Sequence, residues 1–149
     1  MNSELFIKQL AEKSGLQSLS FNDEGVASFK FDIKYTTHLE RSTNDKTVTA
    51  YAKIGSLPSL EREKCLIMLL EANLFSPDAA GATFSLDPDT QEIYFYKTFE
   101  LENLDIDNFF LDLEKFLEAQ RLWTIKIETK EYSSTPKALP TKDLFVKKV

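Results

Sequence analysis

The stretch LIMLLEANLFSPDAAGATFSLDPDT, residues 66–90, contains a helix end, a loop, a strand and a turn in succession. Five apolar residues follow one another from Leu66 to Leu70, so they cover more of a helix surface than the ~100° stripe that one core can bury. Residues 82–86 then alternate between apolar and polar, as a half-buried strand does, and Asp87 opens a polar turn. This order of elements predicts a helix packed beside a sheet.

The helix that ends in this stretch needs apolar neighbours on two sides. We expect it to be capped by Ser59 and to run to about Asn73, with Glu61 and Glu63 near the positive end of its dipole. A chain of 149 residues is too short to build a second layer over this helix easily. Another subunit is therefore the more plausible second apolar neighbour. The helix therefore favours a homodimer.

The N-terminal residues predict a first amphipathic helix. Asn2 or Ser3 can cap it, and Gly15 can end it as the left-handed residue at its C-terminus. Leu5 lies off the apolar face. The residues at helical spacing on that face are Phe6, Ile7, Leu10 and Ala11.

Strands fill the region between the two helices and recur after the second. Alternation and turn residues predict strands at 16–21, 26–33, 36–41 and 47–54, followed by 82–86 and 93–99. The consecutive runs are joined by short polar turns, which is typical of an antiparallel meander. We therefore expect three or four strands between the helices and two strands after the second helix.

The last predicted helix begins near Asp105 and carries an apolar stripe that reaches Trp123. Leu104 and Phe109 are spaced as a hydrophobic staple at its start. The order helix, strands, helix, two strands, helix indicates an α+β fold with an antiparallel sheet packed against helices. From about Thr129 the pattern stops. We expect one domain over residues 1–128 and a disordered tail over 129–149, which has a charge of +3 against −9 for the domain.

Composition and charge exclude several classes of function. A net charge of −6 makes nucleic acid and anionic lipid poor partners. No apolar run is long enough for a secretory signal or a membrane span. One cysteine, Cys65, and one histidine, His38, cannot form an internal disulfide or a Cys/His zinc site. We expect a cytoplasmic protein that binds no metal and no cofactor.

Catalysis is also a weak hypothesis for this chain. His38 is the only possible imidazole base and falls in a predicted edge strand, where we expect a surface histidine, and Cys65 reads as a small buried hydrophobe. Two pairs of acidic residues could act together in catalysis. One pair occupies a turn and the other the start of a helix, where acidic residues are favoured for structural reasons alone. These pairs are Asp87 with Asp89 and Asp105 with Asp107. The sequence favours a protein that is not an enzyme.

The ordered segments of the chain resemble the type III secretion class I chaperones, small acidic dimeric proteins that serve secreted effectors. The resemblance rests on the opening stretch 66–90 and on further segments in the family's order and spacing. These are FIKQLAEKSGL (6–16), SLSFNDEGVASFKFD (18–32), GSLP (55–58), ATFSLDPDTQEIYF (82–95) and LDIDNFFLDLEKFLEAQRLW (104–123). It covers residues 1 to about 128.

The resemblance implies a homodimer with α-β-β-β-α-β-β-α topology and no ATP hydrolysis. It implies a cytoplasmic chaperone of a Gram-negative bacterium that holds the N-proximal segment of an effector extended and ready for export, with the secretion ATPase as a further partner. The residues expected at the dimer interface are Leu66, Leu69, Leu70, Leu74 and Phe84. Those expected to contact the effector are Leu5, Phe29, Phe31, Tyr35 and Leu39.

A second hypothesis keeps the fold and changes the partner. A non-secretory module similar to the YbjN proteins would have the same topology and would act on a folded protein. A third hypothesis, a small enzyme that uses carboxylates, lacks a convergent site. Period two places Phe29 and Phe31 on one face of the sheet without deciding whether helices or an effector cover it.

Overall fold

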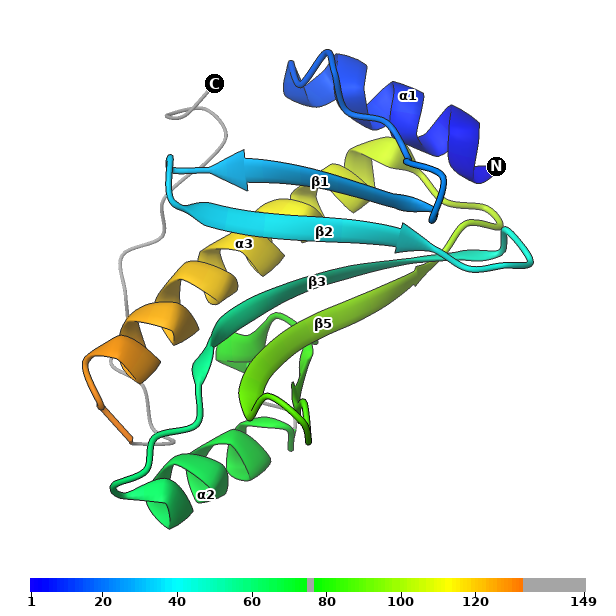
Figure 1. Cartoon of the computed structure of the whole chain (residues 1–149). Coiled ribbons are helices and arrows are strands. Elements are labelled where there is room, and N and C mark those ends of the chain that lie inside the picture. Colours follow the sequence, from blue (N-terminus) through cyan, green and yellow to red (C-terminus); the bar gives the residue numbers. More distant parts are fainter. Residues whose placement is uncertain (75–76, 133–149) are drawn as a thin grey trace.

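The computed structural model describes residues 1–74 and 77–132 and shows three α-helices packed around one antiparallel sheet (Figure 1). The helices are α1 (Ser3–Ser14), α2 (Arg62–Ala72) and α3 (Ile106–Glu128), with a short 3-10 helix at Pro77–Ala79. The strands are β1 (Val26–Phe31), β2 (Tyr35–Arg41), β3 (Thr47–Ser56), β4 (Thr83–Leu86) and β5 (Glu92–Glu100). The predicted α+β fold and its element order are confirmed.

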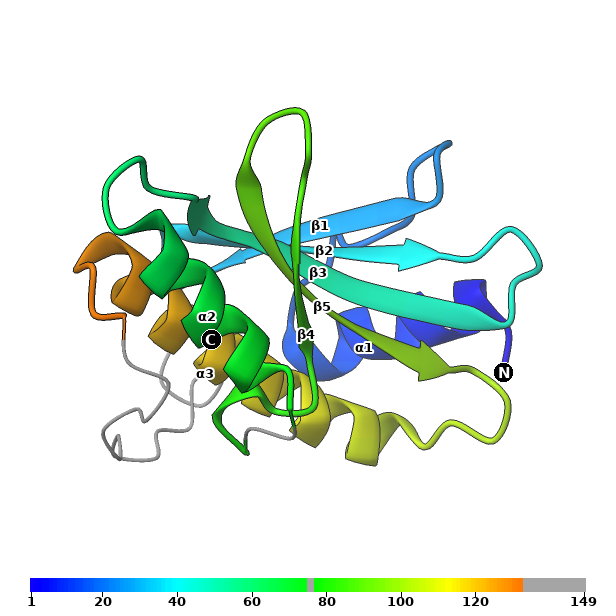
Figure 2. The same ribbon diagram turned by 90° about the horizontal axis from the view of Figure 1, so that it is seen from below.

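The sheet has the strand order β1-β2-β3-β5-β4 with every pair antiparallel. Helices α1 and α3 lie along one face of it, and α2 lies beside β4 at one end (Figure 2). The covered face carries the buried, apolar positions of each strand, and the opposite face carries polar and aromatic side chains. One hydrophobic core therefore lies between the sheet and the two covering helices.

The ends of α1 and α3 form as their sequences predict. The Asn2 side chain accepts a hydrogen bond from the backbone N–H of Leu5, and Gly15 ends α1 in the left-handed conformation. Asp105 caps α3 in the same way, accepting from the N–H of Asp107. Of the two proposed caps for α1, Asn2 serves, and Ser3 is the first residue of the helix.

Two predicted features of the chain are wrong. Residues 16–21 form no strand, because a turn closed by the hydrogen bond from the Leu19 N–H to the Leu16 carbonyl redirects the chain and buries Leu19. Ser59 does not cap α2. The N-cap is Glu61, which has left-handed backbone angles and makes no capping hydrogen bond through its side chain. The loop before α2 is instead fixed by Leu57, which is buried.

Helix α3 is held on the sheet by a polar contact inside the core and by close packing at its end. The buried Gln120 amide donates to the Thr36 carbonyl and accepts from the Thr37 hydroxyl at 2.6 Å. Near the end of the helix, Ile127 lies so close to Gly55 that a Cβ on this glycine would be 2.6 Å from it. The irregularity between Lys53 and Gly55 in the β3–β5 pairing occurs at this approach.

The predicted division into a domain of residues 1–128 and a tail of 129–149 stays a prediction. Helix α3 ends at Glu128, and Tyr132 packs partly against the core. The rest of the predicted tail, residues 133–149, lies outside the described residues.

Candidate binding surfaces

A groove of about 700 Å³ runs along the outer side of α1, between the helix and the segment that follows it. Ile7, Ala11 and Leu19 contribute nearly buried apolar atoms to it, and Leu5 lines it with a side chain that is 45% exposed. The remaining lining residues are polar or charged, namely Asn2, Glu4, Lys8, Glu12, Gln17 and Ser20. An apolar floor with a charged rim suits a peptide that presents apolar side chains.

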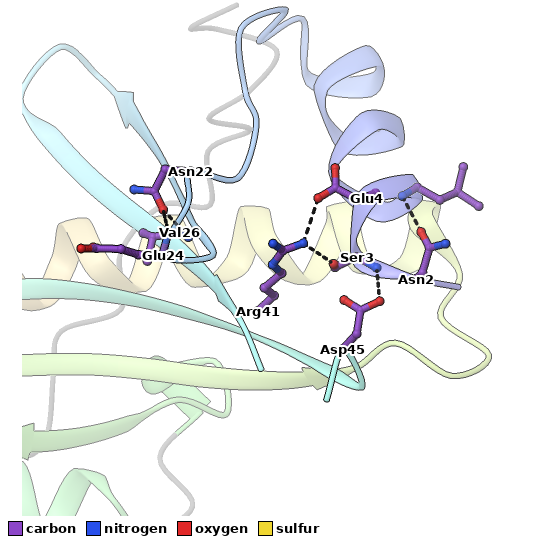
Figure 3. A network of polar contacts seen from close by, with 9 residues as sticks. Asn2, Ser3, Glu4, Asn22, Glu24, Val26, Arg41 and Asp45 are labelled. Carbon is purple, nitrogen blue, oxygen red and sulfur yellow. Dashed lines mark hydrogen bonds and ion pairs between the residues drawn. The ribbon is translucent and has the colours of Figure 1, made fainter. Parts of the chain in front are cut away.

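The helix that forms this groove is anchored at its N-terminus by a polar network (Figure 3). Arg41 on β2 forms an ion pair with Glu4 at 2.8 Å and donates to the Ser3 hydroxyl. The carboxylate of Asp45 accepts from the Ser3 N–H, and hydrogen bonding by Ser3 lowers the pKa of Asp45. Underneath, the ring of Phe6 meets Phe109 of α3 edge to face at 4.8 Å. The groove therefore has a fixed wall.

The five residues expected to contact an effector do not lie on one surface. Leu5 is open to solvent beside the groove. The other four are buried in the core and at most 7% exposed, because the face of the sheet they share is the one that the helices cover; they are Phe29, Phe31, Tyr35 and Leu39. In the single chain they do not form a surface.

Helix α2 has one covered side and one open side, as the run of apolar residues predicts. Cys65, Met68, Leu69 and Ala72 are buried. Leu70 is 69% exposed and Leu74 is 73% exposed, and Ile67 is 46% exposed. Among the residues expected at the dimer interface, Leu70 and Leu74 are thus free to meet another molecule. Leu66 is half-buried, and Leu69 and Phe84 are buried within the chain.

The face of the sheet that none of the described helices covers carries a shallow hollow of about 390 Å³, which the sequence analysis missed. Its lining residues come from three neighbouring strands and are Glu40, Thr49, Tyr51, Tyr94 and Tyr96. We call them the tyrosine hollow. The signal was present in the sequence, because Tyr51, Tyr94 and Tyr96 occupy the positions that alternate with the apolar residues of their strands and therefore share the face away from the core.

The residues considered for catalysis occupy settings that explain them structurally. His38 lies on an internal strand and not on an edge, because β2 pairs with both β1 and β3. Its ring stacks on Tyr51 and bonds the Ser28 hydroxyl at 2.7 Å, and burial lowers its pKa. Cys65 is buried, as predicted, and burial raises the pKa of its thiol.

The acidic pairs lie where local backbone structure explains them, Asp87 in a turn and Asp105 as the N-cap of α3. The Asp87 carboxylate accepts from the N–H groups of Asp89 and Thr90, and these hydrogen bonds lower its pKa. Among residues 1–74 and 77–132, no group of three or more His, Cys, Asp or Glu side chains could hold a metal ion. Within the same described ranges, no helix is long and apolar enough to span a membrane.

Known proteins with similar sequences and structures point to one family. A Tir chaperone of Escherichia coli O157:H7 is 29% identical over 101 residues, which are 68% of this chain and 64% of that protein. This chain therefore matches just under two thirds of that relative's length.

Solved structures share the fold at low sequence identity. A chain of the HopA1–SchA chaperone–effector complex superposes with a TM-score of 0.66 at 19% identity, covering 83% of this chain and 96% of that one. YbjN from E. coli superposes with a TM-score of 0.53 at 12% identity, covering 83% and 92%. The model of the Tir chaperone protein (CesT) family matches residues 5–124, which is most of the chain. The chain therefore belongs to the Tir chaperone protein (CesT) family.

Proposed function

We propose that this protein is a type III secretion chaperone that binds the N-proximal segment of a cognate effector in extended form. Binding stabilises the effector and keeps it competent for export. The observation that carries the proposal is the open groove along α1 in a chain that belongs to a chaperone family. The site of action is the cytoplasm of a Gram-negative bacterium, no catalysis is involved, and the secretion ATPase is a further partner.

The groove has the chemistry that an unfolded client requires. An extended segment exposes apolar side chains that a folded protein would bury, and Leu5 with the floor of the groove offers them about 700 Å³. Glu4, Lys8 and Glu12 form a rim of both charge signs, which can bond the client's polar groups. The anchored N-terminus of α1 keeps the groove open without the client, so binding loses little energy to ordering of the chaperone.

The outer edge of β1 supplies a second mode of contact. β1 lies at one end of the strand order, so among the described residues no strand pairs with its outer side, although the N–H and C=O of Val26 at its start already bond Asn22. Phe29 and Phe31 point into the core, so an added strand would bind through the main chain of β1. This contact selects an extended client of almost any sequence, and the groove then adds side-chain selectivity.

The open side of α2 supports assembly as a homodimer. Ile67, Leu70 and Leu74 form an exposed apolar surface beside β4. Pairing with the same surface of a second copy would remove it from water and would bring two α1 grooves into one assembly. One effector segment could then follow both grooves.

The proposal is tested by recovering the client from the native bacterium under conditions that induce secretion. The tagged protein should retain a single larger protein through its N-terminal region, at one copy per chaperone dimer by light scattering. Leu5→Asp should lower client recovery at least tenfold, because it places a carboxylate in the apolar groove. Leu111→Asp is the matched control, since Leu111 is exposed on α3 outside the lining of the groove.

Two results would contradict the proposal. A Leu5→Asp variant that recovers its client as well as the unmodified protein would remove the groove from the binding site. Recovery of a partner that is bound only in its folded form would instead support a module like YbjN, whose fold is shared.

A further inference from the structure

The tyrosine hollow is built from side chains that the sheet register brings together. Tyr51 on β3 pairs with Tyr96 on β5, and Thr49 on β3 pairs with Glu40 on β2. Tyr94 lies two residues before Tyr96 and therefore points to the same face. Helices α1 and α3 cover the other face, so the hollow opens away from the core.

The hollow has the chemistry of a cation site. Tyrosine rings attract a cation through their faces, and a carboxylate beside them adds a full negative charge. Burial and the nearby Glu40 raise the pKa of Tyr51, so its hydroxyl stays protonated beside that carboxylate. Among the described residues, no ion pair involves Glu40, and the cation–ring contacts that do occur use other rings.

The chain itself contains a segment with the complementary charge. Residues 133–149, which lie outside the described residues, contain four lysines and one aspartate and have a charge of +3. Residues 1–132 have a charge of −9. Pro136 and Pro140 favour an extended backbone, the conformation in which proline-containing peptides lie on aromatic surfaces. Lys137 lies between these two prolines, and Lys142 follows the second one.

The segment starts close enough to reach the hollow within one chain. Ile127 of α3 packs on Gly55, which is two residues from Lys53, and Lys53 pairs with Tyr94 of the hollow. The last turn of α3 therefore lies against the end of β3 on the face opposite the hollow, and the segment must pass around this end of the sheet to reach it. Thr141 is nine positions after Tyr132, and an extended chain of that length spans about 30 Å.

We propose that the basic segment 133–149 docks on the tyrosine hollow of its own chain and places a lysine ammonium over the tyrosine rings beside Glu40. This contact is separate from the groove of α1 and does not depend on the effector function. It would cover the open face of the sheet and keep other cationic peptides from it.

A spin label in the segment tests the docking in the full chain. Thr141→Cys takes the nitroxide, and Cys65→Ala removes the buried native thiol. We expect the amide signals of Thr49, Tyr51 and Tyr96 to be lost in the ¹⁵N spectrum and to return when ascorbate reduces the label. Signals that stay unchanged at these residues, or that are lost along α1 instead, would overturn the proposal.

Charge reversal identifies the contact. Glu40→Lys in the labelled chain should restore the three amide signals, whereas Glu102→Lys, the same charge change at an exposed residue outside the hollow, should leave them lost. Adding Lys137→Glu and Lys142→Glu to Glu40→Lys should bring the loss back. The remaining amide signals report whether each variant is folded. An unaltered loss in Glu40→Lys would overturn the site.

A mixed sample separates docking within one chain from docking between copies. Labelled ¹⁴N chains are mixed with unlabelled ¹⁵N chains. We expect the signals of the hollow to persist in this mixture, and their loss there would overturn docking within one chain. None of these measurements contains an effector, so their failure would leave the proposed chaperone function to its own test.

Discussion

Helices α1 and α2 are nearly equal in length, at 12 and 11 residues, but they differ in how their ends are capped and how far their apolar sides are covered. The N-terminus of α1 is capped by Asn2, its C-terminus is closed by Gly15, and its apolar face is packed on the chain's own core. The side chain of the α2 N-cap, Glu61, accepts no capping hydrogen bond from the helix backbone, and apolar side chains remain exposed along the outer side of α2. The chain itself thus caps both ends of α1 and packs its apolar face, whereas it leaves part of the apolar surface of α2 exposed.

This contrast separates two kinds of apolar surface. Beside α1, solvent reaches a groove whose wall is held in place by contacts within the chain. Such a groove suits reversible binding of the proposed client. Beside α2, Leu70 and Leu74 are exposed on the outer side of the helix. Apolar side chains left in water in this way are typical of a surface that packs against another copy, so this side of α2 suits the proposed dimer.

The largest expected effect is on the packed side of α1. Phe6→Ala should lower the free energy of unfolding by about 3–5 kcal/mol, because Phe6 is fully buried and contacts Phe109. Urea denaturation followed by circular dichroism measures it. Leu5→Ala, one residue away and exposed, is the control and should cost under ~1 kcal/mol. Equal costs would show that α1 is not docked as described.

The next effect concerns the open side of α2. Leu70→Asp should weaken the proposed dimer by at least ~3 kcal/mol, roughly a hundredfold, because dimerisation would bury an unpaired carboxylate. Light scattering across a dilution series measures the mass. Leu111→Asp, also an exposed leucine on a helix, should remain dimeric. A Leu70→Asp protein with undiminished mass would place the interface elsewhere.

The helix caps give a smaller and sharper comparison. Asn2→Ala should cost about 1 kcal/mol of stability, because it removes the acceptor for the Leu5 N–H. Glu61→Ala should cost under ~0.5 kcal/mol, because the Glu61 side chain caps no N–H of α2 and forms only an exposed pair with Lys64. Chemical denaturation of both variants compares them. A larger loss for Glu61→Ala would reverse the ranking of the two helices.

The smallest effect is a pH dependence at the start of α1. Asp45 has its pKa lowered by hydrogen bonding from Ser3 in the folded protein, so folding favours the ionised carboxylate. The stabilisation is present above the unfolded pKa of about 3.9 and is lost as the pH falls through the folded pKa. Asp45→Asn should therefore flatten the fall in Tm on acidification. An identical pH profile in the variant would exclude this contribution.

Much of the fold was predictable because most elements of the core show, within their own residues, the periodicity and the capping residues typical of a strand or a helix. Alternation located β1, β2, β3, β4 and β5, and the caps located the starts of α1 and α3. Residues 16–21 were misleading because their apolar side chains are spaced like a strand, while a turn at Leu16–Leu19 sends them against the core as an irregular segment. Their spacing is decided by tertiary packing, which a local pattern does not contain.

The binding surfaces were less predictable than the fold. The open side of α2 followed from five consecutive apolar residues, because no single core can cover them. Period two placed Phe29 and Phe31 on one face, but which face the helices cover depends on the whole chain. The tyrosine hollow depends on the register of three strands, and one of its strands follows α2 in the chain.

The two hydrogen bonds between Gln120 and β2 also bear on the order in which the protein can be completed during synthesis. They join residues 83 and 84 positions apart, and α3, the last described helix, contributes the core residues Phe116, Leu117 and Trp123. While the ribosome is still making α3, the apolar face of the sheet has been made and has no cover. Most of the chain must therefore be synthesised before the core can close. Until then the apolar face of the sheet is exposed, and the chaperone itself needs protection from aggregation.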